Sequence, residues 1–255
     1  MLKPFLSVAI TALCSAPAFA AWQAEHYDDG QFTLPYQLYT PQQHGQLPLI
    51  IHLHGSGEAG TDNQAQMYQG TNWGPQYFAS AENQAIQPSY VLAPQTPGPM
   101  RWASTTLEPY NYKKTPSTES MTALLHLVDS LLVENPDIDP ARVYITGLSR
   151  GGQGVWNAMM QRPELFAAAL PIAGSADPKQ AKTINQIPTW VFHGSADEVT
   201  NVDYSRQMVD AVIRSGGSTS TIRYSEIEDG GHAASWVTAY GNSDVYRWLM
   251  KHHKQ

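Results

Sequence analysis

The stretch "YITGLSRGGQGVW", residues 144–156, begins as a β-branched, apolar run and then sets one serine among four glycines. Within it, residues 147–151 read Gly-Leu-Ser-Arg-Gly, which is the G-x-S-x-G pattern. Where a strand turns sharply into a helix, glycine on both sides removes Cβ atoms that would collide with either element. Ser149 would then project from the turn at the positive end of the helix. We therefore predict that Ser149 is a nucleophile; the alternative is a tight turn with an incidental serine.

A serine hydroxyl is a poor nucleophile at neutral pH, so it needs a base and an acid that orients the base. For a serine in this setting the chain order is Ser, acid, His, which places both partners after residue 149. Of the four histidines found there, His232 lies in the glycine-bearing loop "EDGGHAASW" between the last predicted strand and the last predicted helix. We predict that His232 is the base. His193 ends a predicted strand, where a His-Gly pair is expected to shape the turn, and His252 and His253 lie on the C-terminal tail.

The acid is predicted to be Asp197, which follows the predicted strand "TWVFHG" by a short turn. Its carboxylate would hold the orientation of the imidazole and stabilise the imidazolium. Two nearby acids, Glu198 and Asp203, are alternatives that would otherwise cap or charge the next helix. Asp177 follows the preceding predicted strand and is a further alternative.

Acyl transfer also needs two backbone N–H donors for the oxyanion. One is expected from Arg150, the residue after the nucleophile, and the other from the loop that follows an early strand. The loop "HLHGSGEAGTDN", residues 52–63, has glycines that let its backbone approach a substrate closely. We predict that the second donor is the N–H of Ser56.

His52 and His54 lie two residues apart in the same segment, a spacing that puts both side chains on one face of a strand. This raises the possibility of a metal site. No third ligand is apparent in the sequence, and the loop itself accounts for His54. We therefore expect no metal.

Strand-like and helix-like segments alternate along the chain. The predicted strands are residues 32–40, 48–55, 89–95, 142–147, 166–174, 188–194 and 218–227. The predicted helices are an apolar stripe over residues 121–132, then residues 151–163 and 202–213, and a C-terminal helix rich in Trp and Tyr. We expect residues 32–40 to form an edge strand, because Pro35 is tolerated there. The alternation predicts an α/β protein with a mostly parallel central sheet flanked by helices, and a site at the carboxyl ends of the strands.

Residues 1–20 predict a secretory signal peptide with cleavage after Ala20, because one lysine, a short apolar core and the small residues "AFA" follow in order. The apolar core is too short for a membrane-spanning helix, and no later segment resembles one. Cys14 raises lipoprotein processing as an alternative, which the bulky Leu13 before it disfavours. Cleavage would leave residues 21–255 as one cysteine-free domain. We expect an exported protein, either periplasmic or extracellular.

The chain carries 15 Lys and Arg against 22 Asp and Glu, a formal net charge of −7. Loss of the predicted signal peptide would also remove Lys3 and make the net charge of the mature chain more negative by one. No basic run or patch appears in the sequence. This argues against nucleic acid and anionic membrane surfaces as partners.

Taken in order, several stretches resemble the α/β-hydrolase superfamily: "LHGSGEAGTDN", "VLAPQ" followed by Trp102, "DPARVYITGLSRGGQGVW", "WVFHGSADEVT" and "GGHAASW". Within it, the chain is similar to secreted or periplasmic esterases often labelled "predicted peptidase", akin to polyhydroxyalkanoate-depolymerase-like and feruloyl or acetyl esterases. The resemblance implies the α/β-hydrolase fold, no cofactor, and a triad of Ser149, Asp197 and His232. It also implies an oxyanion loop at residues 54–57.

No separate lid domain of the lipase kind is visible in the sequence. The long variable connections are residues 62–84 and 97–116, which are rich in Trp, Tyr, Gly and Pro. We expect them to shape the acyl or alcohol pocket, with Trp73 and Trp102 as candidate walls. The alternative is that these aromatic residues pack the loops.

These inferences lead us to expect an exported serine hydrolase that cleaves small-molecule or polymer-borne carboxylic esters through an acyl-enzyme. One rival is a serine peptidase that acts on short peptides with the same triad. A second rival is a non-catalytic binding protein on the same fold, whose signature would be a missing triad residue. The sequence indicates neither an oligomeric state nor the acyl and alcohol groups.

Overall fold

A single eight-stranded sheet forms the centre of the computed structural model, which describes residues 20–68, 70–98, 101–103 and 106–254. The predicted signal peptide lies almost entirely outside these residues. The strands run in the order β1-β2-β4-β3-β5-β6-β7-β8, and β1 and β2 are antiparallel to their neighbours while the remaining pairs are parallel. Their bounds are β1 Ala21–Asp28, β2 Thr33–Thr40, β3 Leu47–Leu53, β4 Tyr90–Pro94, β5 Ile138–Leu148, β6 Ala168–Ile172, β7 Thr189–Gly194 and β8 Ile222–Ile227. The prediction of a mostly parallel sheet is confirmed.

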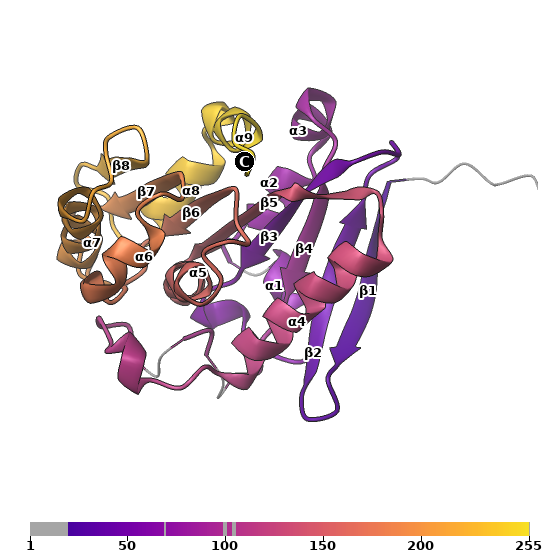
Figure 1. The fold of residues 1–255 in the computed structure, drawn as a ribbon, viewed down its shortest axis with the longest axis horizontal. Coiled ribbons are helices and arrows are strands. Elements are labelled where there is room, and N and C mark those ends of the chain that lie inside the picture. Colours follow the sequence, from indigo (N-terminus) through magenta and orange to yellow (C-terminus); the bar gives the residue numbers. More distant parts are fainter. Residues whose placement is uncertain (1–19, 69, 99–100, 104–105, 255) are drawn as a thin grey trace, which may run out of the picture.

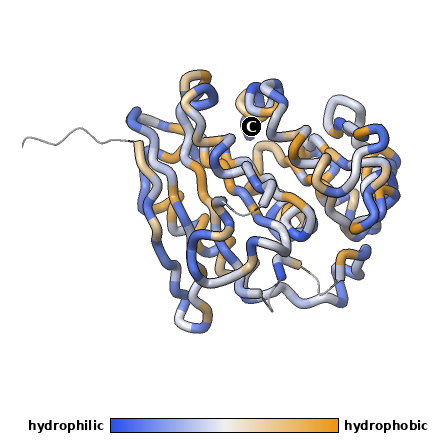
Figure 2. Tube along the Cα trace, turned by 180° about the vertical axis from the view of Figure 1, so that it is seen from behind, coloured by the Kyte–Doolittle hydropathy of each residue, from blue (hydrophilic) through white to orange (hydrophobic). Residues whose placement is uncertain are grey.

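The central strands are apolar because both faces of the sheet are covered. Every residue of β3, β4, β6 and β7 is buried. Continuous apolar runs are the pattern expected for parallel strands with helices on both sides. Figure 2 shows the most hydrophobic segments concentrated in the interior and the hydrophilic ones on the periphery.

Helices on the two faces of the sheet enclose two separate cores. One core packs α4, α5, α6 and α7 against the sheet, and the other packs α2, α8 and α9 against the opposite face. Figure 1 shows α4 and α5 lying across one face, with α8 and α9 beyond the strands. The bounds are α1 Ala65–Tyr68, α2 Gly74–Phe78, α3 Ala81–Ile86, α4 Glu119–Glu134, α5 Arg150–Gln161, α6 Ala181–Ile184, α7 Asp203–Arg214, α8 Ala234–Tyr240 and α9 Ser243–Met250. In the described part of the chain, no helix is both long and apolar enough to cross a membrane.

Two expectations about the ends of the chain are corrected. The strand predicted at residues 32–40 is present as β2, but it is not at the edge, because β1 pairs with it along its whole length. The C-terminal helix is interrupted: α8 ends at Tyr240, Gly241 follows it, and the Asn242 side chain caps the start of α9. The long connection over residues 62–84 contains α1, α2 and the start of α3.

Candidate active site

Ser149 stands at the tip of the turn between β5 and α5. Its φ of 54° lies in the left-handed region, which is unusual for a residue with a side chain. The Ser149 N–H donates to the carbonyl of Ile172 at 2.8 Å, which ties the turn to the neighbouring strand β6. Strained backbone of this kind persists only where the surroundings impose it, and it is concentrated at functional sites.

The glycines after Ser149 are required by close packing of α5 against the sheet. A Cβ on Gly151 would lie 2.0 Å from the carbonyl oxygen of Leu53, and one on Gly152 would lie 2.3 Å from that of Ile172. Real Cβ atoms do not approach backbone so closely. The glycines therefore let the helix begin directly against β3 and β6, which fixes the direction in which the serine points.

His232 joins Ser149 to Asp197. It lies in the turn between β8 and α8, and its Nε2 is 2.9 Å from the Ser149 Oγ. Its Nδ1 is 2.6 Å from the Asp197 Oδ2. Because the ionised carboxylate can only accept, the imidazole donates from Nδ1, and Nε2 accepts from the serine hydroxyl. The structure thus brings together the three residues predicted from the sequence. Asp197 lies 48 residues after Ser149 in the chain, and His232 lies 35 residues after Asp197.

The Asp197 carboxylate is buried and accepts four hydrogen bonds. Its side chain is 0 % exposed, and besides His232 it accepts from His193 Nε2 at 3.1 Å and from the N–H groups of Val199 and Thr200 at 2.8 Å each. Burial alone would raise the pKa of Asp197, but these donors outweigh burial and hold the pKa well below its usual range. Asp197 is therefore ionised and can accept from the imidazole of His232.

His193 is a supporting residue whose contacts the sequence did not reveal. Its Nδ1 is 2.7 Å from the Ser205 hydroxyl, and its Nε2 is 2.9 Å from the Thr200 carbonyl as well as near Asp197. A carbonyl can only accept, so Nε2 carries the proton and Nδ1 accepts from Ser205. His193 thus donates to the acid from the side opposite His232, which fits a supporting role rather than that of the base.

The alternative acids lie elsewhere or are otherwise engaged. Glu198 is exposed, and Asp203 pairs with Arg206 on α7 at 2.8 Å. Asp177 accepts from the N–H groups of Tyr112 and Lys179 and so caps a short 3-10 helix. None of these three contacts His232 through a hydrogen bond among the described residues.

A cavity of about 240 Å³ opens over Ser149 and His232. Ser56 and Gly57, the first residues of a short 3-10 helix after β3, border it, and Arg150 begins α5 directly after Ser149. The backbone segments predicted to supply the oxyanion donors therefore lie next to Ser149. Further lining comes from Gly55, Glu58, Leu107, Leu148, Val199 and Trp236.

Glu58 and Trp236 are lining residues that were not predicted from the sequence. Glu58 is 8 % exposed, and burial raises the pKa of its carboxyl. Trp236 stacks edge-on against the His232 imidazole, with ring centroids 4.9 Å apart. Trp236 follows His232 by only four residues, near the start of α8, and this short separation is a signal by which the sequence could have identified it.

The two tryptophans proposed as pocket walls have different surroundings. Trp102 is 1 % exposed, and its indole Nε1 donates to the His54 carbonyl at 3.1 Å. Because it is buried beneath the oxyanion loop, it supports that loop, and the expectation of a substrate wall is corrected. Trp73 is 64 % exposed and borders a cavity, but that cavity is separate from the one over Ser149.

The imidazole rings of His52 and His54 have different partners and do not form a shared metal-binding position. The His54 Nδ1 donates to the Gly55 carbonyl at 2.6 Å and its Nε2 accepts from the Thr96 N–H at 3.0 Å, so both nitrogens are used. His52 packs against Tyr240 on the other side. Burial lowers the pKa of His54 to about 4 and that of His52 to about 3, so both rings are neutral. Within the described residues, no group of three or more His, Cys, Asp or Glu side chains is placed to hold a metal.

Comparisons with known proteins identify hydrolases as similar to this chain. Residues 111–190, which include Ser149, match the Prolyl oligopeptidase family. The chain is 26 % identical to a poly(3-hydroxyalkanoate) depolymerase C of Paucimonas lemoignei over 67 % of its length, and 27 % identical to a bifunctional acetylxylan esterase/xylanase of Neocallimastix patriciarum over 60 %. It spans only 38 % and 20 % of those two proteins.

A solved structure of a thermostable esterase is more similar. It is 36 % identical with a TM-score of 0.84, and the match covers 91 % of this chain and 63 % of that one. The strand order, the strained serine after β5 and these similarities lead to one conclusion. The chain has the α/β-hydrolase fold.

Proposed function

We propose that this protein is a serine hydrolase that cleaves carboxylic esters. The observation that carries the proposal is the contact of His232 with both Ser149 Oγ at 2.9 Å and Asp197 Oδ2 at 2.6 Å. The named relatives that are esterases or depolymerases support an ester as substrate.

In the proposed reaction, His232 Nε2 takes the hydroxyl proton while the Ser149 Oγ attacks the ester carbonyl. The imidazolium formed is stabilised by Asp197, and the carbonyl oxygen becomes an oxyanion that accepts from the N–H groups of Ser56 and Arg150. His232 then gives its proton to the leaving alkoxide, which departs as the alcohol and leaves the acyl group on Ser149. Water, deprotonated by His232, releases the acid and restores the serine.

Replacement of the nucleophile tests the proposal. Purified protein should hydrolyse p-nitrophenyl esters from acetate to laurate, and Ser149→Ala should reduce turnover by about 10⁶, as loss of the nucleophile does in comparable triads. The ratio of rates along the series measures the depth of the acyl pocket. A Ser149→Ala protein that keeps most of the activity would remove Ser149 from the mechanism.

A serine peptidase is the second candidate, because the matched family is that of prolyl oligopeptidase. An amide has a poorer leaving group, so the His232 imidazolium must protonate its nitrogen before the bond breaks. Ester and amide substrates with the same acyl group separate the candidates. We expect ester turnover to exceed amide turnover, and the reverse order would favour the peptidase.

We also propose that the protein is exported, on the strength of the leader-like residues 1–20. Expression of the full chain in a bacterium, followed by mass measurement of the protein in the periplasm and medium, tests this. The expected mature chain begins at Ala21. Full-length protein confined to the cytoplasm would contradict the proposal.

A further inference from the structure

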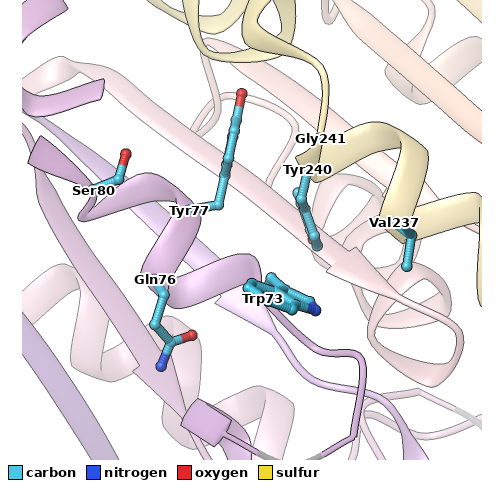
Figure 3. A pocket seen from close by; sticks show the side chains of 7 residues that line it. All are labelled: Trp73, Gln76, Tyr77, Ser80, Val237, Tyr240 and Gly241. Atoms are coloured by element: carbon cyan, nitrogen blue, oxygen red, sulfur yellow. The ribbon is translucent and has the colours of Figure 1, made fainter. Parts of the chain in front are cut away.

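A second cavity, of about 360 Å³, lies beside α8 and shares no lining residue with the cavity over Ser149. One wall comes from α2 and its flanking residues and the other from the end of α8, and Figure 3 shows these two segments facing each other. The cavity is lined by Trp73, Gln76, Tyr77, Ser80, Val237, Tyr240 and Gly241. A volume of this size is in the range of small-molecule sites.

The lining is mainly aromatic and apolar. Trp73 is 64 % exposed and Val237 is 48 % exposed, although both are large apolar side chains. The rings of Tyr77 and Tyr240 are 5.8 Å apart, and their hydroxyls bond to the Asn242 carbonyl and the Thr146 hydroxyl. Because these hydroxyls are engaged within the protein, the tyrosines present mainly their rings to the cavity.

The cavity is close to the catalytic serine because both use α8. Trp236 lines the cavity over Ser149, and the next residue, Val237, lines the second cavity. The opposite wall is tied to the same helix, since the Trp236 Nε1 donates to the Thr71 hydroxyl at 2.9 Å, two residues before Trp73.

We propose that this second cavity binds an uncharged aromatic ring carried by the part of the ester remote from the scissile carbonyl. The proposal rests on the proposed ester hydrolysis. It names the substrate class: esters in which a flexible chain separates the carbonyl from an aryl group. The ring would lie against Trp73, Tyr77 and Tyr240, whose edges and faces favour tilted aromatic contacts.

Size and polarity select a ring over other occupants. An apolar cavity of about 150 Å³ holds benzene, so the larger volume here accommodates a ring with several linker atoms. No charged side chain is among the lining residues. A sugar would need several hydrogen-bonding groups, whereas the lining offers the Gln76 amide and the Ser80 hydroxyl, and the latter already caps α3 by accepting from the Asn83 N–H.

Two ester series test the proposal and identify which side of the ester carries the ring. One series is ω-phenylalkyl acetates and the other is ethyl ω-phenylalkanoates, each with increasing numbers of linker methylenes and each compared with a straight-chain ester of equal carbon number. We expect the ratio of kcat/KM, phenyl over straight-chain, to peak at one linker length in one series. Burial of a ring predicts a peak of about tenfold or more.

Variants locate the effect in the cavity. Val237→Trp fills the space, and the matched control is Val133→Trp, at a valine that is 84 % exposed on α4. We expect Val237→Trp and Trp73→Ala to bring the phenyl preference close to unity, and Val133→Trp to keep both the preference and the basal ester turnover. A flat ratio in both series, or an equal peak in wild type and Val237→Trp, overturns the proposal.

Binding without turnover separates this proposal from the proposed function. Calorimetric titration of 4-phenyl-1-butanol into Ser149→Ala protein should give binding that Val237→Trp weakens about tenfold, by the same burial argument. Such binding, together with a wild-type protein that cleaves no ester, would sustain the cavity site and overturn the proposed function. Ester hydrolysis with neither a phenyl preference nor binding of 4-phenyl-1-butanol would support the proposed function and overturn the cavity proposal. If Val237→Trp changes the sedimentation coefficient but not the preference, the face is covered by a second copy of the chain and the proposal fails.

Discussion

At the scale of single residues, the Asp197 carboxylate is the most heavily bonded group of the candidate site. It accepts from two histidines and two backbone N–H groups. Asp197→Asn keeps the shape of the side chain but lets the amide donate, which favours the wrong tautomer of His232. We expect a fall in turnover of about 10⁴. The matched control is Glu198→Gln at the exposed neighbour, and steady-state ester hydrolysis that falls more in the control would transfer the acid role to Glu198.

The same carboxylate makes stability depend on pH. The pKa of Asp197 is lower in the folded state than in the unfolded chain, so its ionised form stabilises the fold above the unfolded pKa. This contribution is lost as the pH falls from the unfolded value of about 3.9 towards the folded one. The gap in unfolding free energy between wild type and Asp197→Asn should therefore be larger at pH 6 than near pH 3. Urea titrations at both pH values measure it, and a gap that widens on acidification would contradict the assignment.

Glu58 should behave in the opposite way. Burial raises the pKa of this carboxyl, so the folded state holds its proton more tightly than the unfolded chain does. The charged form then lowers stability as the pH rises above the unfolded pKa. Glu58→Gln removes the charge, and we expect it to raise the unfolding free energy relative to wild type more at pH 8 than at pH 4. Equal differences at the two pH values in urea unfolding would show that the buried charge costs nothing.

At the scale of elements, the turn from β5 into α5 tolerates no added carbon. In Gly151→Ala the new Cβ would meet the Leu53 carbonyl at 2.0 Å, so α5 must shift away from the sheet. Overpacking of this kind costs about 1–3 kcal/mol and occasionally more. Gly98→Ala is the control, because its Cβ would have no atom within 4 Å. Denaturant titration should show the loss for Gly151→Ala alone, together with loss of ester turnover.

How far the sequence predicts an element depends on what stabilises it. The strands β3 and β7 are buried along their whole length, and their continuous apolar runs predicted them within a residue or two. β1 has no buried residue, so hydrophobic patterning carries no sign of it. Its strand conformation comes from backbone pairing with β2, which is a tertiary contact. The supposed edge position of β2 was wrong for this reason.

The candidate site was easier to predict than its surroundings. Chain order and glycine spacing pointed to Ser149, Asp197 and His232, because the turn after a parallel strand leaves few places for each group. Trp102 illustrates the limit. An aromatic residue in a long connection becomes either a pocket wall or a core residue depending on what packs over it, and here His54 and the oxyanion loop do so.

At the scale of the whole molecule, β1 lies at one end of the sheet and the candidate site lies beyond its middle. Four strand spacings separate β1 from β5, roughly 19 Å at about 4.8 Å each. A protein that lacks residues 21–28 should therefore keep most of its ester turnover but expose the edge of β2. We expect light scattering and size exclusion to report aggregation. Loss of turnover in the monomer fraction would show that β1 acts on the site, for instance through the Asn63 side chain that donates to the Glu25 carbonyl.

The shared use of α8 has a consequence for how new selectivity arises. The first turn of α8 follows His232 directly, so mutations that reshape this wall of the second cavity also disturb His232, the proposed base. The facing wall, residues 73–80, carries none of the triad. Divergence among descendants of this protein, in nature or in directed evolution, should therefore accumulate on residues 73–80, where preference drifts at little cost to the rate of bond cleavage. Substitutions are therefore expected to be tolerated in the wall formed by residues 73–80 and to be constrained in the wall formed by α8.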